Sequence, residues 1–158
     1  MPTLVLFRHA KAEAHREDDH SRQLASRGRA DAVAAREWLT QQGIAPDRVV
    51  VSTAMRARQT WECGAVGQVP PVYDGRVYEA TAADLLEVLR ETPAGTGTVV
   101  LVGHNPGVEH LAWELDDSDT ARDRTNGGLA TCGLAVFEVT GWAGLSAGVL
   151  REVAVPRG

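Results

Sequence analysis

Apolar and polar positions alternate along the chain in blocks that predict strands separated by helices. Three short, mainly apolar runs, at residues 4–7, 48–51 and 99–102, have the length and β-branched content of buried parallel strands. Residues 134–139 and 149–155 are expected to form the closing strands. Because helical patterns separate the first three strands, we predict an α/β fold, a three-layer α/β/α sandwich with a mainly parallel central sheet.

Helical spacing of apolar residues fills the gaps between these strands. We predict helices over residues 28–42, 55–65, 82–91 and 106–115. The first ends at Gly43, the third follows Thr81 as a cap, and the fourth has Pro106 at its first position. The side of the first helix that is expected to pack on the sheet consists of Ala30, Val33, Ala34 and Trp38.

The remaining segments are polar and predict loops. Residues 13–23 form a polar stretch after the first strand, and residues 141–148 a turn region. Residues 116–128, which end in Asn-Gly-Gly, are expected to be an exposed loop; it lies either near the rim of the strand ends or, as its composition favours, in solvent. Since no repeat or linker divides the sequence, we expect residues 1–158 to form one domain.

Composition narrows the class of protein. The chain has 158 residues, of which 44% are hydrophobic and 23% charged, values that suit a folded domain with its own core. Its formal net charge of −5 argues against nucleic-acid binding, which requires an excess of Lys and Arg to displace counterions from phosphates. Any phosphate-binding site must therefore be local.

Cysteine usage and hydropathy bear on the compartment. Cys63 and Cys132 are too few for a disulfide framework and lack metal-ligand spacing, so we interpret them as buried small side chains in a reducing compartment. No segment approaches the roughly 18–20 apolar residues needed to span a bilayer, and no leader pattern precedes the first strand. We expect a cytoplasmic protein that does not enter the membrane.

Polar and basic residues follow the three apolar runs where each predicted strand ends. They are Arg8 and His9 after the first, Ser52 and Arg56 after the second, and His104 after the third. Because the carboxyl ends of parallel strands share one edge of a sheet, two histidines and two arginines are expected to meet there. A neutral imidazole can attack phosphorus, and guanidinium groups both disfavour its protonation and bind phosphoryl oxygens.

The sequence therefore predicts a phosphoryl-transfer site that needs no metal or cofactor. His9 is the candidate nucleophile, Arg8 and Arg56 hold the phosphoryl oxygens, and His104 donates a hydrogen bond to one of them. Backbone N–H groups at the start of the Pro106 helix add a favourable dipole. Taken singly, an Arg-His pair is more often a surface pair and a Gly-His-Asn-Pro turn a helix cap; their combination favours a site.

Three motifs stand at these strand ends: RHAKA at 8–12, STAMRARQT at 52–60 and VGHNP at 102–106. Together with Arg22 and Leu24 followed by Gly28, and with TCGLAV at 131–136, they resemble the histidine phosphatase superfamily, specifically its small SixA-type phosphohistidine phosphatase branch. The resemblance covers nearly the whole chain. It implies that His9 is transiently phosphorylated, that Arg8 and Arg56 bind phosphate, and that His104 is the second pocket histidine.

Other residues are assigned less directly. Asn105 and Arg22 are candidate substrate-binding residues, and Ser52 either binds a phosphoryl oxygen or caps the following helix. Lys11 either attracts an anionic substrate or is simply solvated. Ala10 stands where glycine is usual in the wider superfamily, which fits the SixA-type branch, and Thr53 stands where proline is common.

The leaving group decides whether a general acid is needed. Superfamily relatives that act on sugar phosphates protonate an alkoxide, and Glu79 lies where such an acid is expected, although Tyr78-Glu79-Ala80 is equally a solvated turn. SixA-type members are implied to need no acid, because phosphohistidine expels an imidazole whose pKa is about 6.5. A short chain also has little material for a lid, which favours an open groove and a protein substrate.

Several functions remain open at this point. The first hypothesis is a metal-independent phosphatase acting on phosphohistidine in a phosphotransfer or signalling protein. The alternatives are a phosphomonoesterase for a small phosphorylated metabolite and a non-catalytic phosphate-binding module. A metal enzyme is disfavoured, because His104 and His110 lack ligand spacing and His15 and His20 lie in a charged stretch. The oligomeric state is not indicated.

Overall fold

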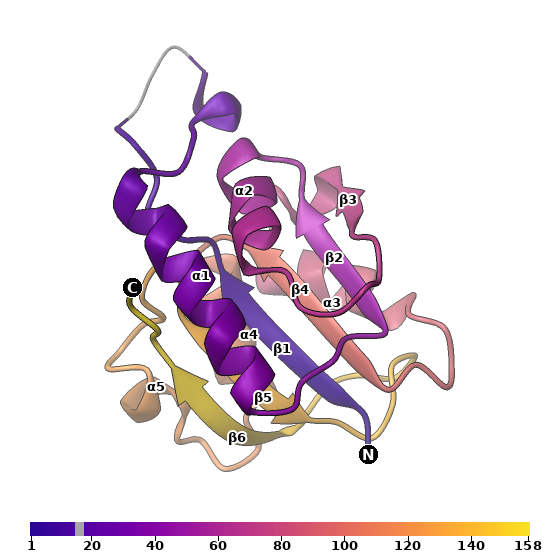
Figure 1. Ribbon diagram of the computed structural model, residues 1–158. Helices are drawn as coiled ribbons and strands as arrows, with labels where there is room; N and C mark the ends of the chain where they lie inside the picture. Colours follow the sequence, from indigo (N-terminus) through magenta and orange to yellow (C-terminus); the bar gives the residue numbers. More distant parts are fainter. Residues whose placement is uncertain (15–17) are drawn as a thin grey trace.

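The computed structural model describes residues 1–14 and 18–158. A six-stranded sheet runs through its centre in the order β3-β2-β4-β1-β5-β6 (Figure 1). The strands are β1 (Thr3–Arg8), β2 (Arg48–Ser52), β3 (Val72–Asp74), β4 (Thr98–Gly103), β5 (Leu134–Glu138) and β6 (Val149–Ala154). Five of these were predicted; β3, a three-residue edge strand, was too short to produce an apolar pattern.

Strand direction determines which residues meet. β1 pairs with β4, β4 with β2 and β2 with β3 in parallel, whereas β5 is antiparallel to β1 and β6 to β5. At the ends of β1 and β4, Arg8 lies opposite Gly103. The carboxyl ends of the four parallel strands therefore share one edge, and the prediction of a mainly parallel sheet is confirmed.

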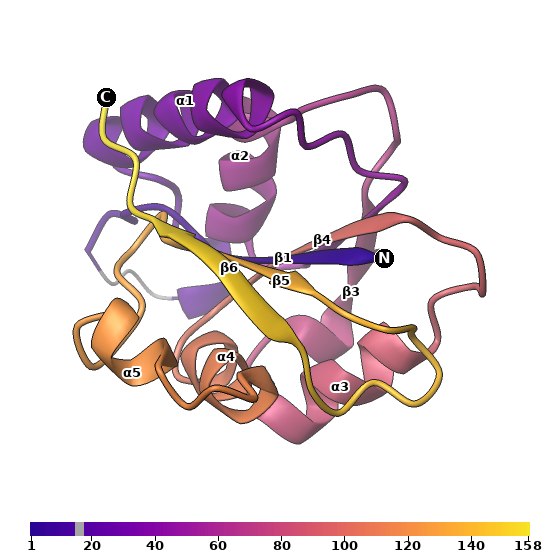
Figure 2. The same cartoon turned by 90° about the horizontal axis from the view of Figure 1, so that it is seen from below.

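Helices cover both faces of the sheet, which makes three layers (Figure 2). One face carries α1 (Ser26–Gln41) and α2 (Met55–Gly64); the other carries α3 (Ala82–Arg90), α4 (Gly107–Leu115) and the short α5 (Ala121–Arg124). Side chains alternate along β1, so that Leu4 and Leu6 join the core beneath α3 and α4, and Val5 and Phe7 the core beneath α1 and α2. The predicted α/β/α sandwich is confirmed.

Local chemistry sets the helix ends. The hydroxyl of Thr81 accepts a hydrogen bond from the N–H of Asp84, whose carboxylate accepts from the N–H of Thr81, a capping box at the start of α3. Gly43 follows α1 with a φ of +69°, a conformation that costs glycine little. Pro106 is the N-cap of α4, so the helix begins at Gly107, one residue later than predicted.

The buried face of α1 differs from the prediction. Ala30 is exposed, and the other three predicted residues are only half-buried. The buried positions that form a row along the helix are Gly28, Ala32, Ala35 and Leu39. Alanines lie on several sides of this helix, so the predicted phase followed Val33 and Trp38. Small residues are needed where α1 packs closely on its neighbours. A Cβ at Gly28, for example, would occupy the space of the Lys11 carbonyl oxygen.

The composition of residues 116–128 suggested an exposed loop, but part of this segment is buried. They contain α5, and Asp116, Ala121 and Thr125 are buried. The Asp116 carboxylate accepts hydrogen bonds from the N–H groups of Thr120 and Ala121. A polar side chain that is satisfied by backbone donors can be buried without a hydrophobic signal in the sequence.

The cysteines and the helices were both subjects of the sequence analysis. Cys63 and Cys132 are both free; Cys132 is buried, and Cys63 only partly so. Of the helices formed by residues 1–14 and 18–158, none has the length and apolar character that crossing a bilayer requires.

Candidate active site

The two predicted histidines lie side by side at the carboxyl edge of the sheet. The imidazole centroids of His9 and His104 are 5.0 Å apart, and their planes are inclined by 55°. His9 directly follows β1, and its backbone N–H donates to the carbonyl of Gly103 at 3.0 Å. The parallel pairing of β1 with β4 thus brings together two residues from distant parts of the sequence.

His9 presents its Nε2 lone pair. Nδ1 lies 2.7 Å from the carbonyl oxygen of Ala10, which can only accept, so Nδ1 carries the proton and Nε2 does not. Burial lowers the pKa of His9 to about 4, and the positive charges of Arg56 and Arg8 act in the same direction. The ring is therefore neutral at pH 7, as a nucleophile must be.

His104 is buried and held by Ser52. Nε2 of His104 lies 2.7 Å from the Ser52 hydroxyl, which also accepts a hydrogen bond from the N–H of Ala54 at 3.2 Å. Nδ1 of His104 is buried without a hydrogen-bond partner among residues 1–14 and 18–158. Burial, followed by the influence of His9, lowers the pKa of His104 to about 3. Ser52 thus contacts both the histidine and the residue that precedes α2.

The two predicted arginines each donate hydrogen bonds from their terminal nitrogens, whereas their Nε atoms make none to the described residues. Arg56 donates from Nη1 to the carbonyl of Asp19 at 2.9 Å and from Nη2 to its carboxylate at 3.1 Å. Arg8 donates from Nη1 to the carbonyl of Leu129 at 2.9 Å. The Nε atoms of both side chains are buried and have no hydrogen-bond partner in the part of the chain that the structure describes. An unmade buried hydrogen bond is costly, and an anion would remove that cost.

Asp19 is a member of the site that the sequence analysis did not single out. It lies on the short 3₁₀ helix η1 (Asp19–Ser21), and besides Arg56 its carboxylate accepts from the Tyr78 hydroxyl at 2.6 Å and from Arg22 Nη1 at 3.0 Å. Hydrogen bonds from Tyr78 and Arg22 hold the pKa of Asp19 well below its usual range. Its place in the polar stretch 13–23 gave no signal that separated it from solvated residues.

Tyr78 and His20 extend the row of rings. The Tyr78 ring stands edge-on to His104, with centroids 5.6 Å apart, and edge-on to His20 at 4.8 Å. The hydrogen bond to Asp19 raises the pKa of Tyr78 to about 12. The sequence analysis placed His20 only in a charged stretch, but its ring lies next to Tyr78, and its Nε2 is 2.9 Å from the hydroxyl oxygen of Thr53. His15 lies outside the described residues.

Asn105 is engaged within the chain. Its Nδ2 donates to the Glu109 carboxylate at 2.9 Å and to the Leu129 carbonyl at 2.7 Å, so both of its N–H groups are used. The Leu129 carbonyl is also the acceptor for Arg8. Asn105, predicted as a substrate-binding residue, is therefore placed where it supports the backbone that holds Arg8.

Arg22 and Lys11 occupy different places. Arg22 lies at the rim, where Nε and Nη2 donate to the carbonyl of Glu13 and Nη1 to Asp19. Lys11 is exposed and lines a separate hollow together with Arg27 and Arg157. The structure thus groups Arg22 with the histidines through Asp19 and does not group Lys11 with them.

A hollow of about 450 Å³ adjoins His104. Arg56, Tyr78 and His104 line one part of it, and Glu79 and His110 line another. Glu79 is exposed and has a φ of +57°, in the left-handed region that non-glycine residues seldom adopt. The residue considered as a general acid therefore does face the space next to the site.

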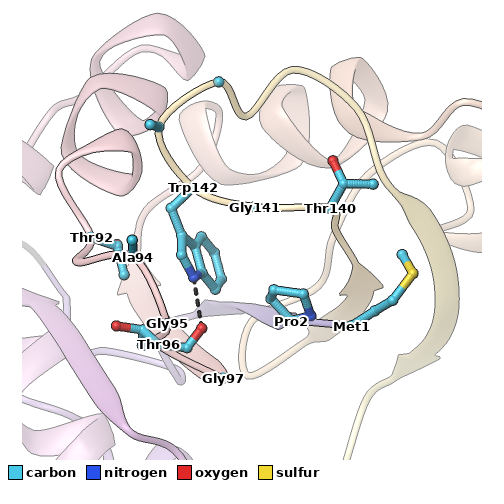
Figure 3. Close-up of a pocket in the computed structure, with 12 residues that line it drawn as sticks. Met1, Pro2, Thr92, Ala94, Gly95, Thr96, Gly97, Thr140, Gly141 and Trp142 are labelled. Atoms are coloured by element: carbon cyan, nitrogen blue, oxygen red, sulfur yellow. Dashed lines mark hydrogen bonds between the residues drawn. The ribbon is translucent and has the colours of Figure 1, made fainter.

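A second hollow, of about 700 Å³, lies at the opposite end of the strands (Figure 3). It is formed by the loop before β4, the loop after β5 and the first two residues, with the Trp142 indole donating to the carbonyl of Thr96 at 2.8 Å. No Asp, Glu, His, Lys or Arg lines it. Because phosphoryl chemistry requires charged or basic groups, the site at the carboxyl edge is the candidate.

The fold and this site define an α/β protein with a candidate anion-binding centre: a neutral histidine, a second histidine and two arginines at the carboxyl edge of a mainly parallel sheet. In residues 1–14 and 18–158, no three His, Cys, Asp or Glu side chains are grouped so that they could hold a metal ion. The donor set is instead suited to an anion.

Comparison with known proteins gives the family. Residues 4–85 match the model of the histidine phosphatase superfamily (branch 1), and the chain belongs to this superfamily. It is 34% identical to an uncharacterized protein of Mycobacterium leprae, covering 85% of this chain and 88% of that protein. It is 36% identical to an uncharacterized protein of Mycobacterium tuberculosis, covering 88% and 92%.

Solved structures agree with the predicted branch. A candidate phosphohistidine phosphatase SixA from Nakamurella multipartitia superimposes with a TM-score of 0.87 at 32% identity, covering 98% of this chain and 96% of that one. Another, from Agrobacterium tumefaciens, gives a TM-score of 0.87 at 28% identity and 99% of each chain. The resemblance to SixA is confirmed, and family and neighbours together support a phosphatase, a hydrolase.

Proposed function

We propose that this phosphatase hydrolyses phosphohistidine carried by another protein, by way of a phosphohistidine intermediate on His9. One observation carries this: a neutral imidazole lies within a group of side chains in which Nε of Arg8, Nε of Arg56 and Nδ1 of His104 are buried without hydrogen-bond partners among the described residues. A phosphoryl group would offer oxygen acceptors to these nitrogens. The SixA neighbours support phosphohistidine as the substrate.

In the first step, the Nε2 lone pair of His9 attacks phosphorus. A bond forms between Nε2 and phosphorus while the P–N bond of the substrate breaks and returns its electron pair to the substrate ring. That ring carries a proton on its other nitrogen, so it leaves as neutral imidazole. Arg8 and Arg56 carry fixed positive charge to the phosphoryl oxygens, and positioning with electrostatic stabilisation supplies most of the catalysis in phosphoryl transfer. Ser52 can donate its proton to Nε2 of His104, which leaves Nδ1–H as a further donor.

In the second step, water attacks the phosphorus atom held on His9. The P–Nε2 bond breaks, its electron pair returns to His9, and inorganic phosphate carries away the oxygen and both protons of the water. The Ala10 carbonyl keeps the proton of His9 on Nδ1 throughout, so Nε2 is the atom that is phosphorylated and released in each cycle. All groups in both steps belong to this chain, the substrate or water.

The geometry favours a side chain presented by a protein. The hollow of about 450 Å³ next to Arg56 and His104 is bordered by exposed residues, among them Glu79, Pro106 and His110. An imidazole ring on a partner's surface can enter such a space. We further propose that the partner is a phosphotransfer or signalling protein and that residues 1–158 act as one catalytic domain in the cytoplasm.

The decisive experiment combines His9→Ala with a phosphohistidine-bearing partner protein. We expect the wild-type chain to release inorganic phosphate and, after rapid quenching, to retain acid-labile phosphate, and we expect His9→Ala to do neither. Retention by the wild-type chain also separates catalysis from simple phosphate binding. Turnover by His9→Ala at the wild-type rate would refute the mechanism, and loss of wild-type turnover in a strong chelator would indicate a metal.

A phosphomonoesterase is the second candidate, and the position of Glu79 on the wall of the hollow favours it. An alkoxide needs a proton as it leaves, whereas imidazole is a far better leaving group. If Glu79 supplies that proton, Glu79→Gln reduces kcat for an alkyl phosphate by about 100-fold and leaves phosphohistidine cleavage nearly unchanged. Comparison of both substrates on both proteins decides between the two functions; equal losses would contradict an acid role confined to esters.

A further inference from the structure

Asp19 is the most heavily engaged carboxylate at the site, and nothing in the proposed mechanism uses it. Its side chain accepts hydrogen bonds from Arg56, Arg22 and Tyr78 at 3.1, 3.0 and 2.6 Å. These donors come from α2, from the segment after η1 and from the end of the 3₁₀ helix η2 (Gly75–Val77). The carboxylate therefore joins three separate parts of the chain next to the anion-binding groups.

We propose that Asp19 is a positioning residue, which turns Arg56 so that its Nε edge faces the phosphoryl group, an inference that rests on the proposed function of that site. A guanidinium can form paired hydrogen bonds along the Nη1–Nη2 edge or along the Nε–Nη2 edge. Asp19 takes the first edge, because Nη1 donates to its carbonyl and Nη2 to its carboxylate. Nε, on the second edge, is buried, and no residue that the structure describes is its hydrogen-bond partner.

The surroundings of Asp19 keep it in place. Arg22, which donates to one carboxylate oxygen, is itself fixed by two hydrogen bonds to the carbonyl of Glu13, at 3.1 and 3.0 Å. Tyr78 donates to the other oxygen, and its ring stands against His104. Because both oxygens are occupied by donors that other elements hold, a substrate cannot rotate the Arg56 guanidinium without breaking this set of contacts.

The opposite role for the same carboxylate would be competition with the substrate. In that case Asp19 would occupy the groups that receive the phosphoryl oxygens, and its removal would strengthen anion binding. The unpartnered Nε of Arg56 argues for positioning, because the edge that side-on phosphate binding uses is not the edge that Asp19 occupies. The two roles predict changes of opposite sign.

Tungstate, a tetrahedral oxyanion, is the probe that separates them. Its affinity is measured calorimetrically for the wild-type chain, Asp19→Asn, Asp19→Glu and Asp117→Asn, a matched charge removal at an exposed position away from the site. We expect Asp19→Asn to bind tungstate at least about tenfold more weakly, Asp19→Glu to recover part of the loss, and Asp117→Asn to bind as wild type does. Weakened binding with an unchanged melting temperature supports positioning.

A spectroscopic signal keeps the test independent of stability. In ¹⁵N NMR spectra, tungstate is expected to shift the Arg56 Nε–H resonance of the wild-type chain and to shift it much less in Asp19→Asn. Should Asp19→Asn fail to fold, Tyr78→Phe removes one of the same contacts and is expected to weaken tungstate binding less strongly.

The outcomes test the positioning role of Asp19 separately from the proposed function of the site. If the wild-type chain binds tungstate through Arg56 and Asp19→Asn (or, if it does not fold, Tyr78→Phe) binds it equally or more tightly, positioning is refuted while the proposed function stands. If tungstate does not perturb Arg56 in the wild-type chain, or if Arg56→Ala binds it as tightly, the anion site itself is refuted.

Discussion

The hydroxyl oxygen of Ser52 lies 2.7 Å from Nε2 of His104, a contact between two buried side chains that are 52 positions apart in the sequence. The same hydroxyl accepts the N–H of Ala54, so its own proton is free to be donated to the imidazole. When Ser52 donates to Nε2, the proton of a neutral His104 is on Nδ1. The sequence allowed Ser52 to be either a helix cap or a substrate contact. In the structure its hydroxyl contacts His104.

Ser52→Ala tests this relationship. We expect kcat to fall about 10–100-fold because the His104 donor is no longer held in one tautomer and orientation. The free energy of unfolding should fall by about 1–2 kcal/mol, because Nε2 and the Ala54 N–H lose a buried partner. Steady-state kinetics and urea unfolding measure both. Activity equal to that of an exposed control, Ser26→Ala, would contradict the role.

The histidine pKa values predict an acid-side loss of stability. The folded-state pKa of His9 is lowered to about 4 and that of His104 to about 3, below the unfolded value of about 6.5. Between these values the unfolded chain binds more protons than the folded chain. The free energy of unfolding should therefore fall as the pH decreases through this window. The stabilisation that comes from the two lowered histidine pKa values is complete above about pH 6.5.

NMR titration of the ring carbons checks this assignment directly. Both rings should remain neutral at pH 5, where a histidine of ordinary pKa would be almost fully charged. Arg56→Gln should raise the pKa of His9 only modestly, because burial is the larger cause. A wild-type midpoint near 6.5 for either ring would contradict the buried, neutral state on which nucleophilic attack depends.

Glu109 is predicted to maintain the backbone that holds Arg8. Its carboxylate accepts from the Asn105 side chain at 2.9 Å and from the N–H of Leu129 at 3.0 Å, and its charge opposes the lowering of the Arg8 pKa by burial. Glu109→Ala should raise KM about tenfold and increase hydrogen exchange at the Leu129 amide. Glu114→Ala, at an exposed position of the same helix, is the control and should change neither.

Gly107 is predicted to tolerate no side chain. A Cβ at this position would occupy the space of the Ala80 carbonyl oxygen, next to the hollow that Arg56 and His104 line. Gly107→Ala should therefore destabilise the chain by about 1–3 kcal/mol and alter turnover. Gly144→Ala meets open space and should be nearly neutral. Equal urea midpoints for the two variants would show that the Ala80 segment yields without cost.

The layered fold and the grouping of four central side chains could be predicted from the sequence alone. Buried parallel strands produce continuous apolar runs, and the residues that follow them must share an edge, so Arg8, His9 and His104 could be placed together before any coordinates were known. Arg56 followed from the second run in the same way. These inferences hold because periodicity is a property of the local sequence, and because helices between successive strands imply that the strands run parallel.

Tertiary structure decided the rest. Asp19 and Tyr78 meet Arg56 only because η1 and η2 converge on α2, and no local pattern encodes contacts between such distant segments. The phase of α1 depended on which small side chains let helices approach, a packing property rather than a hydrophobic one. The burial of Asp116 depended on backbone donors that α5 supplies. Periodicity fixes elements and strand edges, whereas the pairing of polar groups across elements is settled only when the chain is packed.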